Sequence, residues 1–219
     1  MQALIPEEDS VLMSIYNHAT IIDPKKAAKM AEAVDAYMIK VLDYDILTYA
    51  PHVREELLKI TDIIDEVRPS DDRGKVLIQN LYNFRAKLIE INQKTVLVAQ
   101  SVLSPSHWSI IVLLSILIDA LLLGLRTASP ISSVVIAILF VTPYLILNLL
   151  YEVDSNRFLA NHLAYESPQN VFLSIGKLPY YPETVLNSGT IKNPKAPYRV
   201  GVYLDLASSL KKKIKTIRR

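Results

Sequence analysis

The chain of 219 residues contains no cysteine and only five glycines. Without cysteine, the chain can form neither a disulfide framework nor a thiolate metal site. The five glycines stand far apart, so no glycine-rich loop is present to hold a phosphate group. We therefore expect neither a metal ion nor a nucleotide-type cofactor.

Signatures of catalysis are also absent from the sequence. The four histidines are scattered without metal-ligand spacing, and the short motifs of serine hydrolases, zinc peptidases and dithiol oxidoreductases do not occur. The paired acids Glu7-Glu8 and Asp71-Asp72 are interpreted as charges at helix starts, where the helix dipole favours carboxylates. The sequence therefore predicts a protein that is not an enzyme and has no catalytic residues.

Long hydrophobic runs are present, at residues 108–125 and 131–150. Each approaches the ~20 apolar residues needed to cross a hydrocarbon core of ~30 Å, and neither has the polar stripe of a soluble amphipathic helix. The break at 126–130 is so short that the two helices must run antiparallel. Because the N-terminus lacks a basic and then apolar leader, the first run would itself direct insertion. The sequence predicts a transmembrane hairpin over residues 105–151.

Charge is unevenly distributed on the two sides of the hairpin. Residues 1–107 carry 12 Lys+Arg and 16 Asp+Glu, whereas residues 152–219 carry 11 and 5. Basic residues flank the two runs at the ends that lie away from the connecting loop, and the loop itself holds only Arg126. Under the positive-inside rule both termini should be cytoplasmic. Trp108 and Tyr151 are expected to be lipid-surface residues, both at the cytoplasmic interface of the membrane.

Residues 1–104 are predicted to form a cytoplasmic helix bundle. Apolar residues recur at helical spacing over about 7–21, 24–49, 51–67 and 71–103. Asp23-Pro24 is typical of a helix start, because an aspartate cap is followed by proline at the first helical position. This part of the sequence shows almost no strand signal.

Residues 152–219 are rich in tyrosine and proline and are expected to contain short helices near 157–165 and 168–175, followed by extended or turn structure. Such a segment should pack on the bundle, on a neighbouring chain or on lipid headgroups. Apolar residues at helical spacing over 203–217 predict a basic amphipathic helix that anionic lipids would attract. Its lipid-facing cations are Lys211, Lys212, Lys213, Lys215, Arg218 and Arg219. RNA-binding motifs are absent, and no nucleic acid partner is expected.

Asp119 is the most suggestive single residue, since it lies seven positions before Arg126, about 10 Å inside the first run. A carboxyl group at that depth usually faces protein or water. Ser115 and Asp119 share one helical face, as do Ser133, Tyr144 and Asn148 of the second run. Three interpretations remain open. The two faces can form a helix-contact seam, the more common role of small and polar residues, or they can line a pore. Asp119 can also snorkel through a thinned bilayer.

Thr142-Pro143 interrupts the middle of the second run. Proline frees a carbonyl group, which a neighbouring hydroxyl can satisfy. The dipeptide is therefore interpreted as a kink, with a gating hinge or an ion-coordinating carbonyl as the alternative.

Three features together resemble a bacterial and plastid family of bestrophin-like membrane proteins. Leu81-Tyr82-Asn83-Phe84-Arg85-Ala86-Lys87-Leu88 lies in the last predicted bundle helix, and Pro105 shortly precedes Trp108 and the two apolar runs. Tyr151-Glu152-Val153-Asp154-Ser155-Asn156-Arg157-Phe158 then follows the second run. The resemblance covers about residues 75–175. It implies an oligomeric, channel-like membrane protein with anions as the candidate ions.

The expected fold is therefore an all-α integral membrane protein with a helix bundle, a hairpin and a basic C-terminal helix. Two membrane helices cannot enclose a pathway, so a transport role requires a homo-oligomer or a larger complex. The alternative is a non-transporting scaffold or accessory subunit, and a third idea is a membrane-tethered signalling protein whose bundle senses a partner.

Overall fold

The computed structural model describes residues 4–44, 49–69, 72–100, 105–124, 130–154, 163–189, 191, 194–203 and 212–218. The chain divides into two compact units. The helix–sheet unit combines residues 1–100 with 159–219, and the hairpin unit comprises residues 101–158. Helices dominate both units, as predicted, but the helix–sheet unit also contains a small β-sheet, so the all-α prediction is wrong in that respect.

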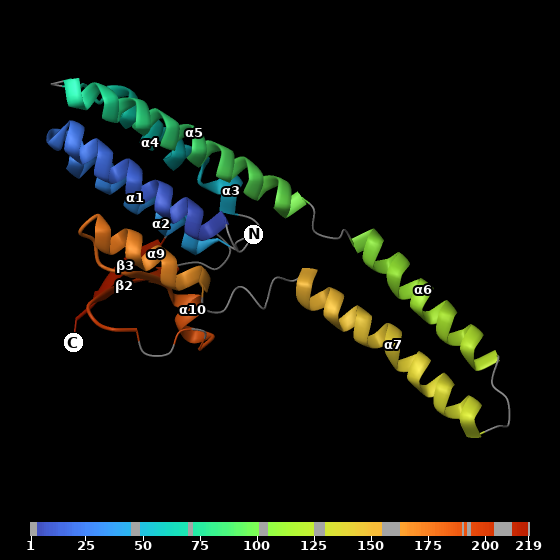
Figure 1. The fold of residues 1–219 in the computed structure, drawn as a ribbon. Helices are drawn as coiled ribbons and strands as arrows, with labels where there is room; N and C mark the ends of the chain where they lie inside the picture. The colour runs from blue at the N-terminus through green and yellow to red at the C-terminus, as the bar shows by residue number, and fades with distance from the viewer. Residues whose placement is uncertain are drawn as a thin grey trace. The chain divides into compact units, whose positions relative to one another are not determined.

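The N-terminal part of the helix–sheet unit is built from helices α1 (Leu4–Ile22), α2 (Ala27–Asp43), α4 (Arg54–Glu66) and α5 (Asp72–Gln100) (Figure 1). A 3₁₀ turn, η1 (Pro24–Lys26), precedes α2, and the short α3 (Tyr49–His52) precedes α4. The apolar stripes predicted from the sequence form the core, in which Leu12, Ile15, Met38, Ile60 and Leu81 are fully buried. Burial of each such side chain stabilises the unit by roughly 1.5–3 kcal/mol.

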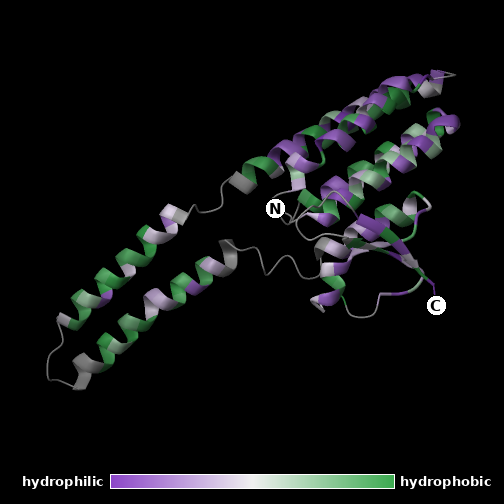
Figure 2. Ribbon diagram, turned by 180° about the vertical axis from the view of Figure 1, so that it is seen from behind, coloured by the Kyte–Doolittle hydropathy of each residue, from purple (hydrophilic) through white to green (hydrophobic). Residues whose placement is uncertain are grey.

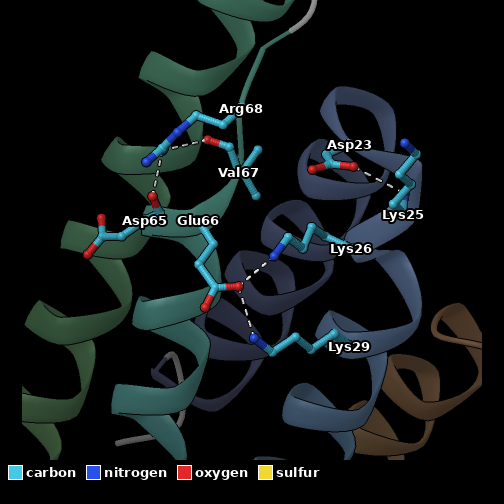
Figure 3. A network of polar contacts seen from close by, with 8 residues as sticks. All are labelled: Asp23, Lys25, Lys26, Lys29, Asp65, Glu66, Val67 and Arg68. Carbon is cyan, nitrogen blue, oxygen red and sulfur yellow. Dashed lines mark hydrogen bonds and ion pairs between the residues drawn. The ribbon is translucent and has the colours of Figure 1, made fainter.

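The predicted start signal at Asp23-Pro24 is confirmed. The Asp23 carboxylate accepts a hydrogen bond from the Lys25 backbone N–H at 3.2 Å, and Pro24 occupies the first position of η1. Figure 3 shows that Glu66, at the end of α4, faces this turn. Its carboxylate pairs with Lys26 Nζ at 2.5 Å and with Lys29 Nζ at 2.9 Å, which lowers the pKa of Glu66 to about 2. These contacts connect the beginning of α2 to the end of α4.

The C-terminal segment contributes α9 (Leu163–Ser174), β1 (Tyr180–Pro182), α10 (Glu183–Asn187), β2 (Tyr198–Tyr203) and β3 (Lys212–Ile217). The strands form one sheet in the order β1-β2-β3. β1 pairs with β2 in parallel, with Tyr180 opposite Arg199. β2 pairs with β3 in antiparallel orientation, with Tyr198 opposite Ile217. The predicted helix near 157–165 lies largely outside the described residues.

The C-terminal segment packs on the chain's own helices, which is the first of the three alternatives posed by the sequence. Arg199 of β2 forms a two-pronged ion pair with Asp35 of α2, at 2.6 and 2.8 Å. The Tyr180 hydroxyl donates to Asp43, at the end of α2, at 2.6 Å. The Gln169 side chain donates to the Tyr180 carbonyl oxygen at 3.1 Å and accepts from its N–H at 2.9 Å. Both buried backbone groups of Tyr180 are thereby satisfied.

Gly201 of β2 is required by the path of the Tyr180 side chain. A Cβ atom placed on Gly201 would lie 1.9 Å from the Tyr180 hydroxyl oxygen and 2.8 Å from the ring carbon that bears it. The phenol crosses the glycine to reach Asp43, and Tyr180 is completely buried, so the ring has little room to move. Glycine at this position permits the close approach of side chain and backbone.

The prediction of a basic C-terminal amphipathic helix is wrong, because residues Lys212–Ile217 form strand β3. Ile214, Thr216 and Ile217 are β-branched and suit a strand, and β2 offers a free edge with which they pair. Lys212 forms an ion pair with Asp43 on the helices, which fixes the strand at one end. Residues 204–211 lie outside the described residues, and with them the first half of the predicted helix.

The hairpin unit consists of α6 (Pro105–Gly124) and α7 (Pro130–Asp154). Figure 2 shows that hydrophobic residues predominate on both helices, whereas the helices of the other unit mix hydrophobic and hydrophilic residues. The segments Ser106–Gly124 and Val134–Tyr151 are long and apolar enough to cross a membrane. This confirms the two predicted apolar helices to within a few residues.

Substitution Gly201→Ala should destabilise the helix–sheet unit by about 1–3 kcal/mol, because the added methyl group collides with Tyr180. Hydrogen exchange measured by mass spectrometry should then be faster in peptides covering β1 and β2. Gly124→Ala is the control, since a Cβ there meets nothing within 4 Å. Unchanged protection of β1 and β2 in the Gly201 variant would contradict the assigned packing.

Candidate functional site

A partly open groove of about 270 Å³ lies between α6 and α7 of the hairpin unit. Its polar residues are Ser115 and Asp119 from α6 and Tyr144 from α7. Apolar side chains form most of the remaining wall, among them Phe140 and Leu147. The groove therefore brings together Ser115, Asp119, Pro143 and Tyr144, four of the residues that the sequence singled out.

Of the described residues that line the groove, only Asp119 is charged. Its Oδ1 atom is buried and has no hydrogen-bond partner among the described residues. The hydroxyl of Ser115, one turn earlier, donates to the Ile111 carbonyl oxygen at 2.9 Å. A carboxyl group in such surroundings is costly unless a proton, a cation or a polar group from another molecule satisfies it.

The sequence also singled out Thr142, Asn148 and Ser133 in the hairpin. The Thr142 hydroxyl donates to the Ile138 carbonyl oxygen at 2.9 Å, and helix α7 continues through Pro143. Asn148 is exposed and does not line the groove. The side chain of Ser133 lies outside the described part of the chain. The pore-lining role and the helix-contact role of these residues both stay predictions.

The predicted interface residues Trp108 and Tyr151 meet at one end of the hairpin. Their ring centroids are 6.2 Å apart, with an angle of 71° between the ring planes. This edge-to-face contact places the two amphipathic rings at the same level, as the sequence prediction requires.

The basic residues of the C-terminus are only partly in the predicted setting. Lys213, Lys215 and Arg218 are exposed, whereas Lys212 pairs with Asp43. Lys211 and Arg219 lie outside the described residues. The role of these cations at a lipid surface stays a prediction.

A second cluster lies in the helix–sheet unit, where Glu8 and Asp9 of α1 are each 2% exposed. The two carboxylate oxygens of Glu8 accept hydrogen bonds from Tyr37 of α2 and, at 2.6 Å, from Tyr49 of α3. Asp9 interacts with the Ser167 side chain of α9, and its Oδ2 atom has no partner among the described residues. Four helices therefore meet around one pair of buried acids.

Burial dominates the ionisation of this pair. It raises the pKa of Asp9 from 3.8 to about 7, against the opposing hydrogen bond from Ser167, and the negative charge of Glu8 raises the Asp9 pKa further. Burial also raises the pKa of Glu8, although the hydrogen bonds from Tyr37 and Tyr49 oppose the shift. The cluster is therefore suited to retaining a proton near neutral pH.

The interpretation of Glu8 as a helix-start charge is wrong. Glu8 precedes Leu12 by four residues and Ile15 by seven, so it lies on the same face of α1 as the buried apolar residues. That spacing could have revealed its burial, whereas the tyrosines that bind it lie 29 and 41 residues away in the sequence. Among the described residues, no group of three or more potential ligands is arranged to hold a metal ion.

The helix–sheet unit should lose stability as the pH rises from 5 to 8. The folded-state pKa of Asp9 is raised to about 7, so its contribution is complete below about pH 4 and disappears as the pH passes 7. The loss is roughly 4 kcal/mol at most, and thermal unfolding followed by circular dichroism at several pH values should detect it. Asp9→Asn should flatten this dependence, whereas Glu7→Gln, two residues earlier on α1, should preserve it. An equally steep dependence in the Asp9 variant would refute the assignment.

Comparison with known proteins gives one family. The model of the Bestrophin-like domain matches residues 1–156, which include α1–α7 and end before α9. No curated protein and no solved structure matches the chain. The match extends the resemblance seen in the sequence to the N-terminus and confirms it. With well over half of its residues matched, the chain belongs to the family of proteins with a Bestrophin-like domain.

Proposed function

We propose that the chain is one subunit of an oligomeric, channel-like membrane protein whose hairpin spans the bilayer. The observation that carries this proposal is the groove between α6 and α7, where Asp119 has a buried oxygen atom that finds no partner among the described residues. An ionisable group within an apolar helix is uncommon and typically belongs to a substrate or ion pathway. Membership of the Bestrophin-like domain family supports the channel-like character.

Oligomerisation follows from geometry. Two helices can form a groove but cannot surround a continuous polar pathway, because one side of the groove stays open to lipid. Further helices from other copies would close the open side of the groove and place Asp119 and Tyr144 toward a shared axis. The arrangement requires more than one hairpin for any conduction.

Anions are the candidate ions implied by the resemblance to bestrophin-like proteins, and Asp119 restricts how they could pass. An ionised carboxylate repels an anion, and α6 and α7 contain no lysine or arginine to compensate. We therefore propose that anions pass only when Asp119 is protonated or paired with a cation.

A scaffold or accessory subunit is the second candidate function. The predominantly apolar wall of the groove favours it, because the same residues can form a tight contact with helices of another protein. In that case Asp119 would accept a hydrogen bond from the partner and no ion would cross.

We propose that both termini are cytoplasmic and that the exposed cations Lys213, Lys215 and Arg218 attract anionic headgroups. The distribution of basic residues around the hairpin supports this orientation.

Purified protein in liposomes should conduct chloride, and Asp119→Ala should increase the chloride flux by about tenfold, equivalent to roughly 1.4 kcal/mol in the barrier. The physical reason is the removal of a negative charge from the pathway. Leu121→Ala is the matched control, since Leu121 is strongly exposed on the same helix and lies outside the groove. Absence of flux would favour the scaffold, and flux that Asp119→Ala leaves unchanged would contradict the assignment of Asp119 to the pathway.

Single cysteines can test the orientation directly, because the chain has no cysteine of its own. Ser10→Cys and Lys215→Cys should be protected from a membrane-impermeant maleimide in intact cells, whereas Ala128→Cys should react. Permeabilised cells serve as the control for reactivity. Labelling of positions 10 and 215 without labelling of position 128 would reverse the proposed topology.

A further inference from the structure

The negative charge of Asp119 has no basic counterpart within reach on helices α6 and α7. Helices α6 and α7 contain no lysine or arginine, and the histidine at 107 lies twelve residues away, about 18 Å along the helix. Arg126, seven residues after Asp119, comes after the end of α6 and lies outside the described residues. A second copy of α6 and α7 would likewise bring acids but no lysine or arginine. A positive charge at this point must therefore come from outside these two helices.

The wall of the groove is poorly suited to a metal ion. Calcium takes six to eight oxygen ligands, and magnesium and zinc also require several donors in a fixed geometry. The groove offers one carboxylate and the hydroxyl groups of Ser115 and Tyr144, with apolar side chains elsewhere. No metal-ligand cluster occurs among the described residues. A cation that needs few hydrogen bonds and carries an apolar body is the better match.

Two aromatic side chains in the wall of the groove further favour an organic cation. Phe140 and Tyr144, both on α7, line the same groove as Asp119. The faces of such rings attract organic cations, and the attraction is greater where water is excluded. The apolar side chains Val112 and Leu147 provide contacts for hydrocarbon substituents. The volume of about 270 Å³ suits a small ligand with a single ring.

We propose that the groove between α6 and α7 is a binding site for a small lipophilic cation, of the quaternary ammonium type, whose charge lies against Asp119 and whose apolar part contacts Phe140 and Leu147. The site requires the hairpin alone and does not depend on conduction. A cation bound here would neutralise the carboxylate that otherwise opposes anions, so the site could also modulate the pathway proposed above.

Binding can be measured with phenyltrimethylammonium on the full-length protein in lipid nanodiscs, by isothermal titration calorimetry with empty nanodiscs as the blank. The cation should bind saturably to the unmodified chain. Asp119→Asn should weaken binding by about tenfold or more, because it removes the charge and retains the shape of the side chain. Phe140→Leu should weaken binding by about two- to fivefold through loss of the ring.

Two controls separate charge recognition from general partitioning. Benzenesulfonate is a single-ring anion of similar size and should not bind saturably. Glu166→Gln removes one acid from α9, whose exposed side chain does not line the groove, and should leave the affinity for phenyltrimethylammonium unchanged. Gel filtration of each variant shows whether its assembly is retained.

Equal affinity in the Asp119→Asn variant, or saturable binding of benzenesulfonate to the unmodified protein, would overturn the proposal. So would an Asp119→Asn variant that changes the oligomeric mass but not cation binding, which would assign Asp119 to a contact between copies. Saturable, Asp119-dependent binding in a protein that conducts no ions would support the site while removing the channel proposal. The two proposals can thus fail separately.

Discussion

A buried polar or charged group must find its partner inside the protein, and this requirement shapes both units of the chain. In the hairpin unit it restricts the backbone to helices, because hydrocarbon offers no hydrogen bonds to N–H and C=O groups. Among the described side chains of α6 and α7, the buried Oδ1 atom of Asp119 is the one that lacks a partner. That one residue is the reason to look for a ligand, a proton or another chain at the groove.

Other acids of the chain meet the same requirement in two different ways. Asp35 and Asp43 of α2 pair with Arg199 and Lys212, and these pairs fasten the C-terminal strands to the helices. Glu8 and its neighbour Asp9 are surrounded by hydroxyl groups, and burial raises the pKa of both so that a proton neutralises the pair more readily.

Asp119 has neither arrangement among the described residues. Most of the groove wall around it is hydrocarbon. An acid that is left unmatched in this setting indicates a function more strongly than an acid that is already paired. The groove is therefore the part of the chain most directly linked to activity.

Local patterns in the sequence were sufficient for the helices but not for the contacts between distant segments. The apolar runs and the Asp23-Pro24 start depend on neighbouring residues, and the structure confirms them. Strand β3 depends on pairing with β2, so its helical spacing of apolar residues was misleading. The partners of Glu8 come from α2 and α3, and only the position of Glu8 on the apolar face of α1 could have indicated its burial.

The residues of the groove were predictable from the sequence only where they lie on one helix. Ser115 and Asp119 are one turn apart, so their shared face follows from the sequence. Their approach to Phe140 and Tyr144 depends on how the two helices pack, which the spacing within one helix cannot determine. Asn148 shows the difference, because it has the spacing of the predicted stripe but does not line the groove.

The central claim is that one hairpin is incomplete and functions only together with other hairpins. The mass of the purified full-length protein in mild detergent, measured by light scattering coupled to gel filtration, tests this claim most directly. The account predicts a stable assembly of two or more copies, each of 24.7 kDa after subtraction of the detergent. A stable monomer that retains its fold would contradict it.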